Sequence, residues 1–82
     1  MATIPLHAVF RGDFSLLLVC VDDQDTIEVV AQRVAHHVIH RRLQPQDAAM
    51  RVQYNHRVLQ PDQTVSQAGI VPMSFVEVFY DT

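Results

Sequence analysis

The fold is decided by residues 25–38, which read DTIEVVAQRVAHHV. Apolar side chains recur in this stretch at intervals of three and four residues, the spacing of one face of an α-helix. The stripe consists of Ile27, Val30, Ala31, Val34, Ala35 and Val38. The stretch therefore predicts an amphipathic helix that lies with one side against an apolar surface.

Both ends of this helix carry recognisable signals. Asp25 followed three residues later by Glu28 predicts a capping box, in which each side chain satisfies a free backbone amide of the first turn. Arg41 and Arg42 favour the C-terminal end of the helix, and Pro45 closes it soon afterwards.

Strand patterns flank the helix on both sides. Residues 4–11 alternate between apolar and polar side chains, and Gly12-Asp13 supplies a tight turn. Residues 14–21 are apolar almost throughout, as expected of a strand covered on both faces. We expect one face of that strand to meet the helix and the other to meet another subunit.

Further strands follow the helix. Residues 50–54 alternate, Asn55-His56-Arg57 turns the chain into a short strand at Val58-Leu59, and residues 74–80 alternate again. Between them, Thr64 or Asp62 is suited to cap a short helical turn over 65–68. Gly69 is expected to end that turn in a left-handed conformation.

A hairpin, a helix, two strands and a final strand follow one another in the order of a ubiquitin-like β-grasp. We therefore predict an α+β fold over residues 1–82 as a single domain, with a mixed four- to five-stranded sheet and one main helix packed across it. The chain contains no lysine and its last residues are Phe79-Tyr80-Asp81-Thr82, without a C-terminal Gly-Gly. We expect a scaffold for docking rather than a conjugated modifier.

Composition narrows the function. Hydrophobic residues make up 49% of the 82 residues, which is rich for so small a domain and suggests apolar surface facing a partner. A net charge of −3 argues against nucleic acid. No apolar run reaches membrane-spanning length, and we expect a cytoplasmic protein with no membrane association. The lone Cys20 lies in an apolar run and is expected to be buried and unreactive.

Possible chemistry centres on the histidines of the helix. His36 and His40 are one helical turn apart and His37 gives an alternative pair with His40, so a metal site is conceivable. The usual further ligands are absent, however, and histidines on an exposed or partner-facing helix surface are the preferred interpretation. Asp22, Asp23 and Asp25 read as capping residues. We therefore expect no catalytic residue, cofactor or metal in this chain.

The remaining candidates are partner-binding side chains. Arg41 and Arg42 offer forked donors suited to carboxylates on a partner, although they equally suit the helix dipole. Phe14, beside the predicted turn, is the aromatic residue best placed to act as an anchor. His37 joins this set through the resemblance described next.

The chain resembles the small gamma subunit, or system protein B, of toluene monooxygenase hydroxylases over essentially its whole length. In the helix region His37, Arg41, Arg42 and Pro45 match the family pattern, whereas His36 and His40 depart from it. The remaining resemblance lies in residues 4–10 (IPLHAVF), Asp13-Phe14, Asp25-Thr26, Val30-Ala31, Val34-Ala35, Leu43-Gln44, Met50-Arg51-Val52, Pro61, Ser66, Gly69, Ile70 and Pro72.

The resemblance implies a β-grasp protein with no cofactor of its own. It implies binding to the alpha subunit of a multicomponent monooxygenase hydroxylase, beside a beta subunit, in a dimer of heterotrimers. The di-iron centre would lie in the alpha subunit, and a Rieske ferredoxin, a reductase and an effector protein would complete the system. Residues 53–58 are shorter and differently charged than in toluene relatives, so an alkene or isoprene substrate is as plausible as an aromatic one. A standalone ubiquitin-like interaction module is the alternative.

Overall fold

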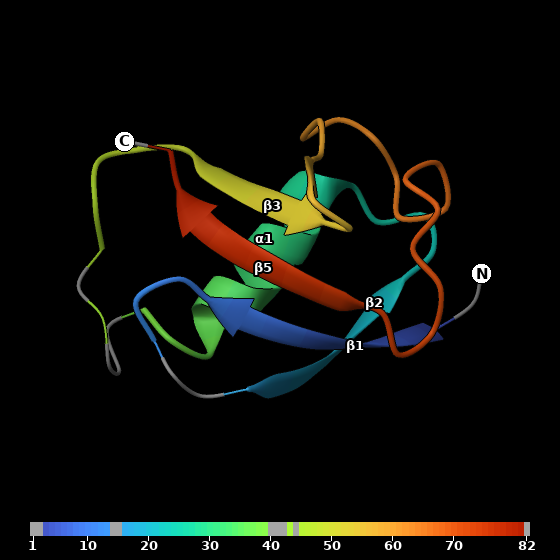
Figure 1. The fold of residues 1–82 in the computed structure, drawn as a ribbon, viewed down its shortest axis with the longest axis horizontal. Helices are drawn as coiled ribbons and strands as arrows, with labels where there is room; N and C mark the ends of the chain where they lie inside the picture. The colour runs from blue at the N-terminus through green and yellow to red at the C-terminus, as the bar shows by residue number, and fades with distance from the viewer. Residues whose placement is uncertain (1–2, 14–15, 40–42, 44, 82) are drawn as a thin grey trace.

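The computed structural model describes residues 3–13, 16–39, 43 and 45–81. In this part of the chain, five strands and one helix follow the predicted order (Figure 1). They are β1 (Thr3–Phe10), β2 (Leu17–Asp22), α1 (Ile27–His36), β3 (Met50–Tyr54), β4 (Arg57–Val58) and β5 (Phe75–Tyr80).

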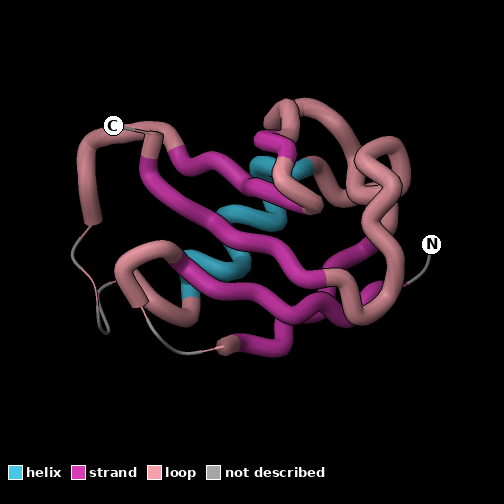
Figure 2. Tube along the Cα trace, in the orientation of Figure 1, coloured by secondary structure: helices cyan, strands magenta, loops and turns pink. Residues whose placement is uncertain are grey.

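The strands form one mixed sheet in the order β2-β1-β5-β3-β4. β1 pairs antiparallel with β2 and parallel with β5, and β3 pairs antiparallel with both β5 and β4. The sheet thus joins β1 and β5, from opposite ends of the chain, at its centre, while α1 crosses behind it (Figures 1 and 2). This arrangement confirms the ubiquitin-like β-grasp.

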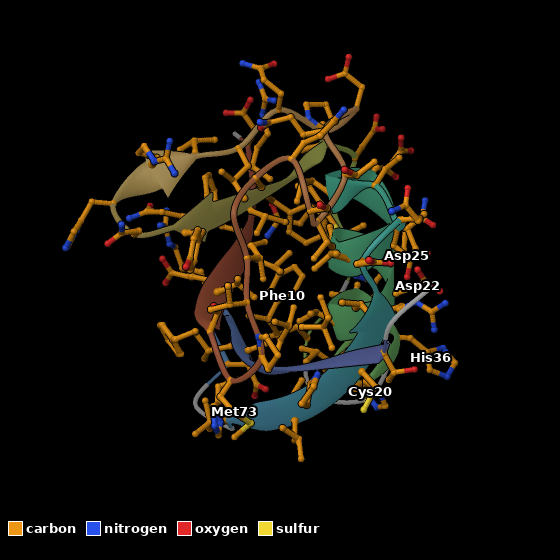
Figure 3. The ribbon with its side chains drawn as sticks, turned by 90° about the vertical axis from the view of Figure 1, so that its right-hand side faces the viewer. Phe10, Cys20, Asp22, Asp25, His36 and Met73 are labelled. Atoms are coloured by element: carbon orange, nitrogen blue, oxygen red, sulfur yellow. The ribbon has the colours of Figure 1, made fainter. Side chains whose placement is uncertain are left out.

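The core lies between the sheet and α1, as the helical stripe predicted. The longer strands contribute alternate residues: Leu6, Ala8 and Phe10 of β1 are fully buried, and Figure 3 shows Phe10 between the sheet and the helix. The helix contributes Ile27, Val30, Ala31, Val34 and Ala35. Val38 completes the stripe and is also buried.

The N-terminal cap of α1 differs from the predicted capping box. Thr26 is the cap, and its Oγ1 accepts a hydrogen bond from the Val29 amide at 3.3 Å. Asp25 instead accepts a bond from the Asp22 amide through Oδ2 at 2.9 Å, and so closes the turn between β2 and the helix. A threonine directly after an acid offers a second capping oxygen, and the turn geometry decides which one is used.

The helix is also shorter than predicted. It ends at His36, and His37 forms its C-terminal cap. Arg41 and Arg42, predicted at the C-terminal end of the helix, lie outside the described residues. The amides of His37 and Val38 bond to carbonyls three residues back, which tightens the chain out of the α-helical path. Val38 therefore reaches the core from the turn after the helix.

The segment before β5 follows its predicted turn chemistry. Thr64 Oγ1 accepts from the Gln67 amide at 3.0 Å, and the Ala68 amide donates to the Thr64 carbonyl at 3.0 Å. Gly69 then adopts a positive φ of 79°, the left-handed conformation expected of it. No helix in the described part of the chain has both the length and the apolar character that crossing a bilayer requires.

Candidate docking surface

The sheet has one face against α1 and one outer face without a covering element among the described residues. On β5, Val76 and Val78 point inward, so Phe75, Glu77 and Phe79 lie on the outer face. The registers place His7 beside Phe75. The outer face is the candidate partner-binding surface, because exposed apolar patches on small domains often mark protein interfaces.

An apolar patch lies at one end of this face. His7 is paired with Leu18 on one side and with Phe75 on the other, so these two apolar side chains flank it. Leu18 is 63% exposed and Phe75 is 54% exposed. Met73, also exposed, lies on the side of the sheet away from the helix (Figure 3). We call Leu18, Met73 and Phe75 the apolar patch.

Charged side chains occupy the other end of the outer face. Arg11 Nη2 donates to Glu77 Oε1 at 2.8 Å, and its guanidinium carbon lies 4.1 Å from the centre of the Phe79 ring. The hydrogen bond to Glu77 raises the pKa of Arg11. Arg51 Nε also donates to Asp81 Oδ2, at 3.2 Å. The outer face therefore combines apolar side chains with charged groups that are already paired.

A groove of about 430 Å³ runs along the edge of the sheet, between β2 and α1. Leu18, Val19 and Cys20 form its strand side. The helix side includes Val29 and Arg33 together with His36 and His37. We call it the β2–α1 groove.

Cys20 corrects the prediction of a buried thiol, because its side chain is exposed. β2 is an edge strand, and among the described residues α1 is the element that packs on it, from one face. The buried positions are Val19 and Val21, and the alternating residues Leu18 and Cys20 are exposed. The unbroken apolar run therefore did not distinguish the buried positions of this strand from the exposed ones.

Of the predicted partner-binding residues, Phe14, Arg41 and Arg42 lie outside the described residues. His37 is exposed on the groove, with its ring 5.6 Å from that of His36. His40, the third histidine of the conceivable metal site, also lies outside the described residues. In the rest of the chain no group of three or more His, Cys, Asp or Glu side chains is arranged to hold a metal ion.

The sequence interpretation missed the apolar patch. A signal existed for Phe75, because the alternation of 74–80 placed it opposite Val76 and Val78. Leu18 gave no such signal, since its neighbours in 14–21 are equally apolar. Met73 gave none, because it lies in the turn before β5, outside the alternating pattern, where its φ is 69°.

A family model and one known protein match this chain over nearly its whole length, and another known protein matches part of it. The family model described as toluene-4-monooxygenase system protein B (TmoB) matches residues 3–80. The gamma subunit of the hydroxylase component of the toluene-4-monooxygenase system of Ectopseudomonas mendocina is 36% identical over 84 aligned residues, covering 99% of both chains. The gamma subunit of the oxygenase component of the alkene monooxygenase system of Xanthobacter autotrophicus is 45% identical over 49 residues, covering 60% of this chain and 56% of its own.

Solved structures agree with these matches. A chain in the complex of toluene 4-monooxygenase HD with the inhibitor 4-bromobenzoate superimposes with a TM-score of 0.93 at 33% identity, covering 98% of this chain and all of that one. Caldiarchaeum subterraneum ubiquitin superimposes with a TM-score of 0.77 at 22% identity, covering 99% of this chain and 96% of its own. The second likeness concerns the fold alone.

Proposed function

Because this chain belongs to the family of toluene-4-monooxygenase system protein B and is a gamma subunit of a monooxygenase hydroxylase, we propose that it works by docking on the catalytic alpha subunit and stabilising it. The observation that carries the proposal is the full-length match to a hydroxylase gamma subunit. The chain contributes binding surface and no catalytic residue. The assembly is a dimer of heterotrimers of alpha, beta and gamma subunits in the cytoplasm.

The outer face of the sheet supports a docking role. Leu18, Met73 and Phe75 are large apolar side chains, each more than half exposed. Apolar and aromatic groups of this kind form the centres of stable protein interfaces, while paired charges surround them. Phe14, His37, Arg41 and Arg42 remain proposed contributors to the contact.

The di-iron centre of such a hydroxylase belongs to the alpha subunit. Di-iron centres of helix bundles take glutamates from two helices and a Glu-x-x-His motif from each of two others. In α1 the residue three positions after Glu28 is Ala31, so this helix lacks the motif. Within the described residues the chain does not fit a metal, and we assign the iron to its partner.

The whole system oxidises an aromatic hydrocarbon or an alkene, such as toluene or isoprene, with O₂ and NADH. A reductase, a Rieske ferredoxin and an effector protein supply and regulate the electrons. Both kinds of substrate are represented by relatives, since one belongs to a toluene and the other to an alkene monooxygenase system. We assign substrate selection to the alpha subunit, to which the di-iron centre is also assigned.

Co-purification tests the docking role. The chain, co-expressed with the alpha and beta subunits of its hydroxylase, is expected to elute in one large complex that contains iron. Omitting the chain should lower the thermal stability of the alpha subunit, measured by calorimetry of the remaining complex. Elution of the chain as a free monomer in the presence of folded alpha and beta subunits would contradict the proposal and favour a standalone interaction module.

A further inference from the structure

The free edge of the sheet is the second surface of the molecule that calls for a partner. β2 forms this edge, and the β2–α1 groove runs along it. In Figure 3, Cys20 of β2 and His36 of α1 lie on the same side of the molecule, and both line the groove.

The backbone of β2 shows which groups this edge offers. The His7 amide donates to the Ser74 carbonyl at 2.9 Å, and the Pro5 carbonyl accepts from the Met73 amide at 2.7 Å. These β1 residues therefore direct their backbone groups toward β5, and the alternate β1 residues direct theirs toward β2. In the antiparallel register His7 lies opposite Leu18, and Pro5 lies opposite Cys20. Leu18 and Cys20 consequently present their N–H and C=O groups to the outside.

The outward backbone groups at the C-terminal end of β2 have hydrogen-bond partners, and those in its middle do not among the described residues. The outward amide of Asp22 is taken by Asp25 Oδ2 at 2.9 Å, and the Asp22 carbonyl accepts from the Asp25 amide at 3.0 Å. Among the described residues no comparable cap covers Leu18 or Cys20. Proteins commonly protect an exposed strand edge with charges, proline or a bulge. This edge has apolar side chains instead, with Leu16 and Leu18 each more than 60% exposed.

The helix wall of the groove indicates the charge of the occupant. Arg33 reaches Asp25 at 3.5 Å through Nε, yet its side chain remains 52% exposed. His36 and His37 extend the same wall. A chain with a net charge of −3 thus places a cation and two imidazoles along an apolar edge, which complements a segment with carboxylate side chains.

We infer that the β2–α1 groove receives an extended, acidic segment of the hydroxylase partner, which adds to β2 as a further strand. The added backbone bonds to the N–H and C=O groups of Leu18 and Cys20, and its inward side chains enter the groove beside Val29 and Arg33. This inference rests on the proposed docking function and names the form of part of the contact. Leu18 belongs to both the groove and the apolar patch, so the two surfaces are continuous.

A second copy of the chain is a poorer occupant. Pairing two β2 strands about a two-fold axis perpendicular to the sheet would bring both α1 helices to the same face. Both grooves, each lined by an Arg33, would then meet at the same interface, and like charges disfavour such an interface.

Hydrogen–deuterium exchange tests the inference on the unmodified chain. In the free chain, the amides of Leu18 and Cys20 should exchange quickly, while those of Val19 and Val21 are protected by β1. In the assembled hydroxylase we expect exchange at Leu18 and Cys20 to slow about tenfold or more. A chain that joins the complex while these amides still exchange quickly would overturn the inference and leave the docking function intact. Failure to join the complex would contradict the docking function itself.

Two pairs of variants separate the backbone and charge contributions. Cys20→Pro removes an outward N–H without breaking a bond to β1, whereas Cys20→Thr keeps it. We expect Cys20→Pro to weaken assembly about tenfold relative to Cys20→Thr, because a partner carbonyl loses its donor. Arg33→Glu should weaken assembly more than Arg57→Glu on the opposite edge strand. Equal effects within either pair would overturn the corresponding contact.

Controls exclude misfolding and self-association. Circular dichroism should show each variant folded at the assay temperature. Sedimentation of the free chain should show a monomer whose Leu18 and Cys20 amides exchange at rates independent of protein concentration. A dimer with these amides protected would assign the edge to a second copy and overturn the assignment to the hydroxylase partner.

Discussion

Replacing Phe75 with alanine should weaken assembly of the hydroxylase without unfolding the chain. Phe75 is 54% exposed, so covering it removes about 110 Å² from water if a phenylalanine presents roughly 200 Å². At about 25 cal/mol per Å², full coverage is worth about 2.7 kcal/mol. Because alanine keeps part of the contact, we expect Kd to rise about 30-fold, equivalent to about 2 kcal/mol.

Competition measures this difference directly. Equal amounts of the isotope-labelled original chain and the unlabelled variant compete for a limiting amount of alpha and beta subunits. Mass spectrometry of the isolated complex then gives the ratio of the two chains. The relative affinity follows from that ratio without a separate Kd for each.

Phe79→Ala is the matched control, because it changes the same residue type on the same strand and face. Phe79 lies four residues further along β5, about 13 Å away, beneath Arg11. Phe79→Ala should lower the free energy of unfolding of the free chain. It should change the free energy with which the chain binds the alpha and beta subunits by less. Incorporation of Phe75→Ala within about threefold of the original chain would refute the role of the apolar patch.

Other changes test the fold and its surfaces. Val34→Ala should cost about 2 kcal/mol in urea unfolding, because Val34 is fully buried, while the exposed Val58→Ala stays within about 0.5 kcal/mol. Thr26→Ala should cost about 1 kcal/mol through loss of the helix cap, and Thr26→Ser should restore it. Gly69→Ala should cost about 1 kcal/mol from backbone strain alone, since its φ is 79° and nothing lies within 4 Å of an added Cβ. A thiol reagent should label Cys20 in the folded free chain under conditions that leave its melting curve unchanged; labelling only after unfolding would contradict its exposure.

The sequence predicted those parts of the fold in which the pattern has a single solution. In β3, in β5 and in the helical stripe from Ile27 to Val38, the apolar side chains lie on one side of the element. A shift by one residue would expose these apolar side chains. The helix cap was predicted wrongly because neighbouring Asp25 and Thr26 both carry a capping oxygen. Only the turn between β2 and α1 assigns these oxygens to different amides.

The helix was predicted to extend too far at its C-terminal end for a related reason. Val38 continues the apolar stripe, so the periodicity gave no sign that α1 stops at His36. Periodicity reports which side chains are buried, whereas hydrogen bonds define the helix, and the two separate where the chain tightens after His36.

The docking surface was harder to predict than the core, because its definition depends on what the chain leaves uncovered. An apolar side chain reads the same in a sequence whether its own fold or a partner covers it. Leu18 and Val19 illustrate this point, since the first is exposed and the second is buried on the same strand. The difference follows from the position of β2 at the sheet edge, which requires the full strand order.

The central position of β5 has a consequence for how the chain folds during its synthesis. β5 separates β1 from β3 in the sheet, and it is made after the four other strands of this sheet. Until residue 80 has left the ribosome, the β1–β2 hairpin and β3 have no strand to connect them, and α1 has only part of its packing surface. Folding to the native sheet is therefore expected to follow translation of β5, with a nascent chain that exposes apolar surface until then.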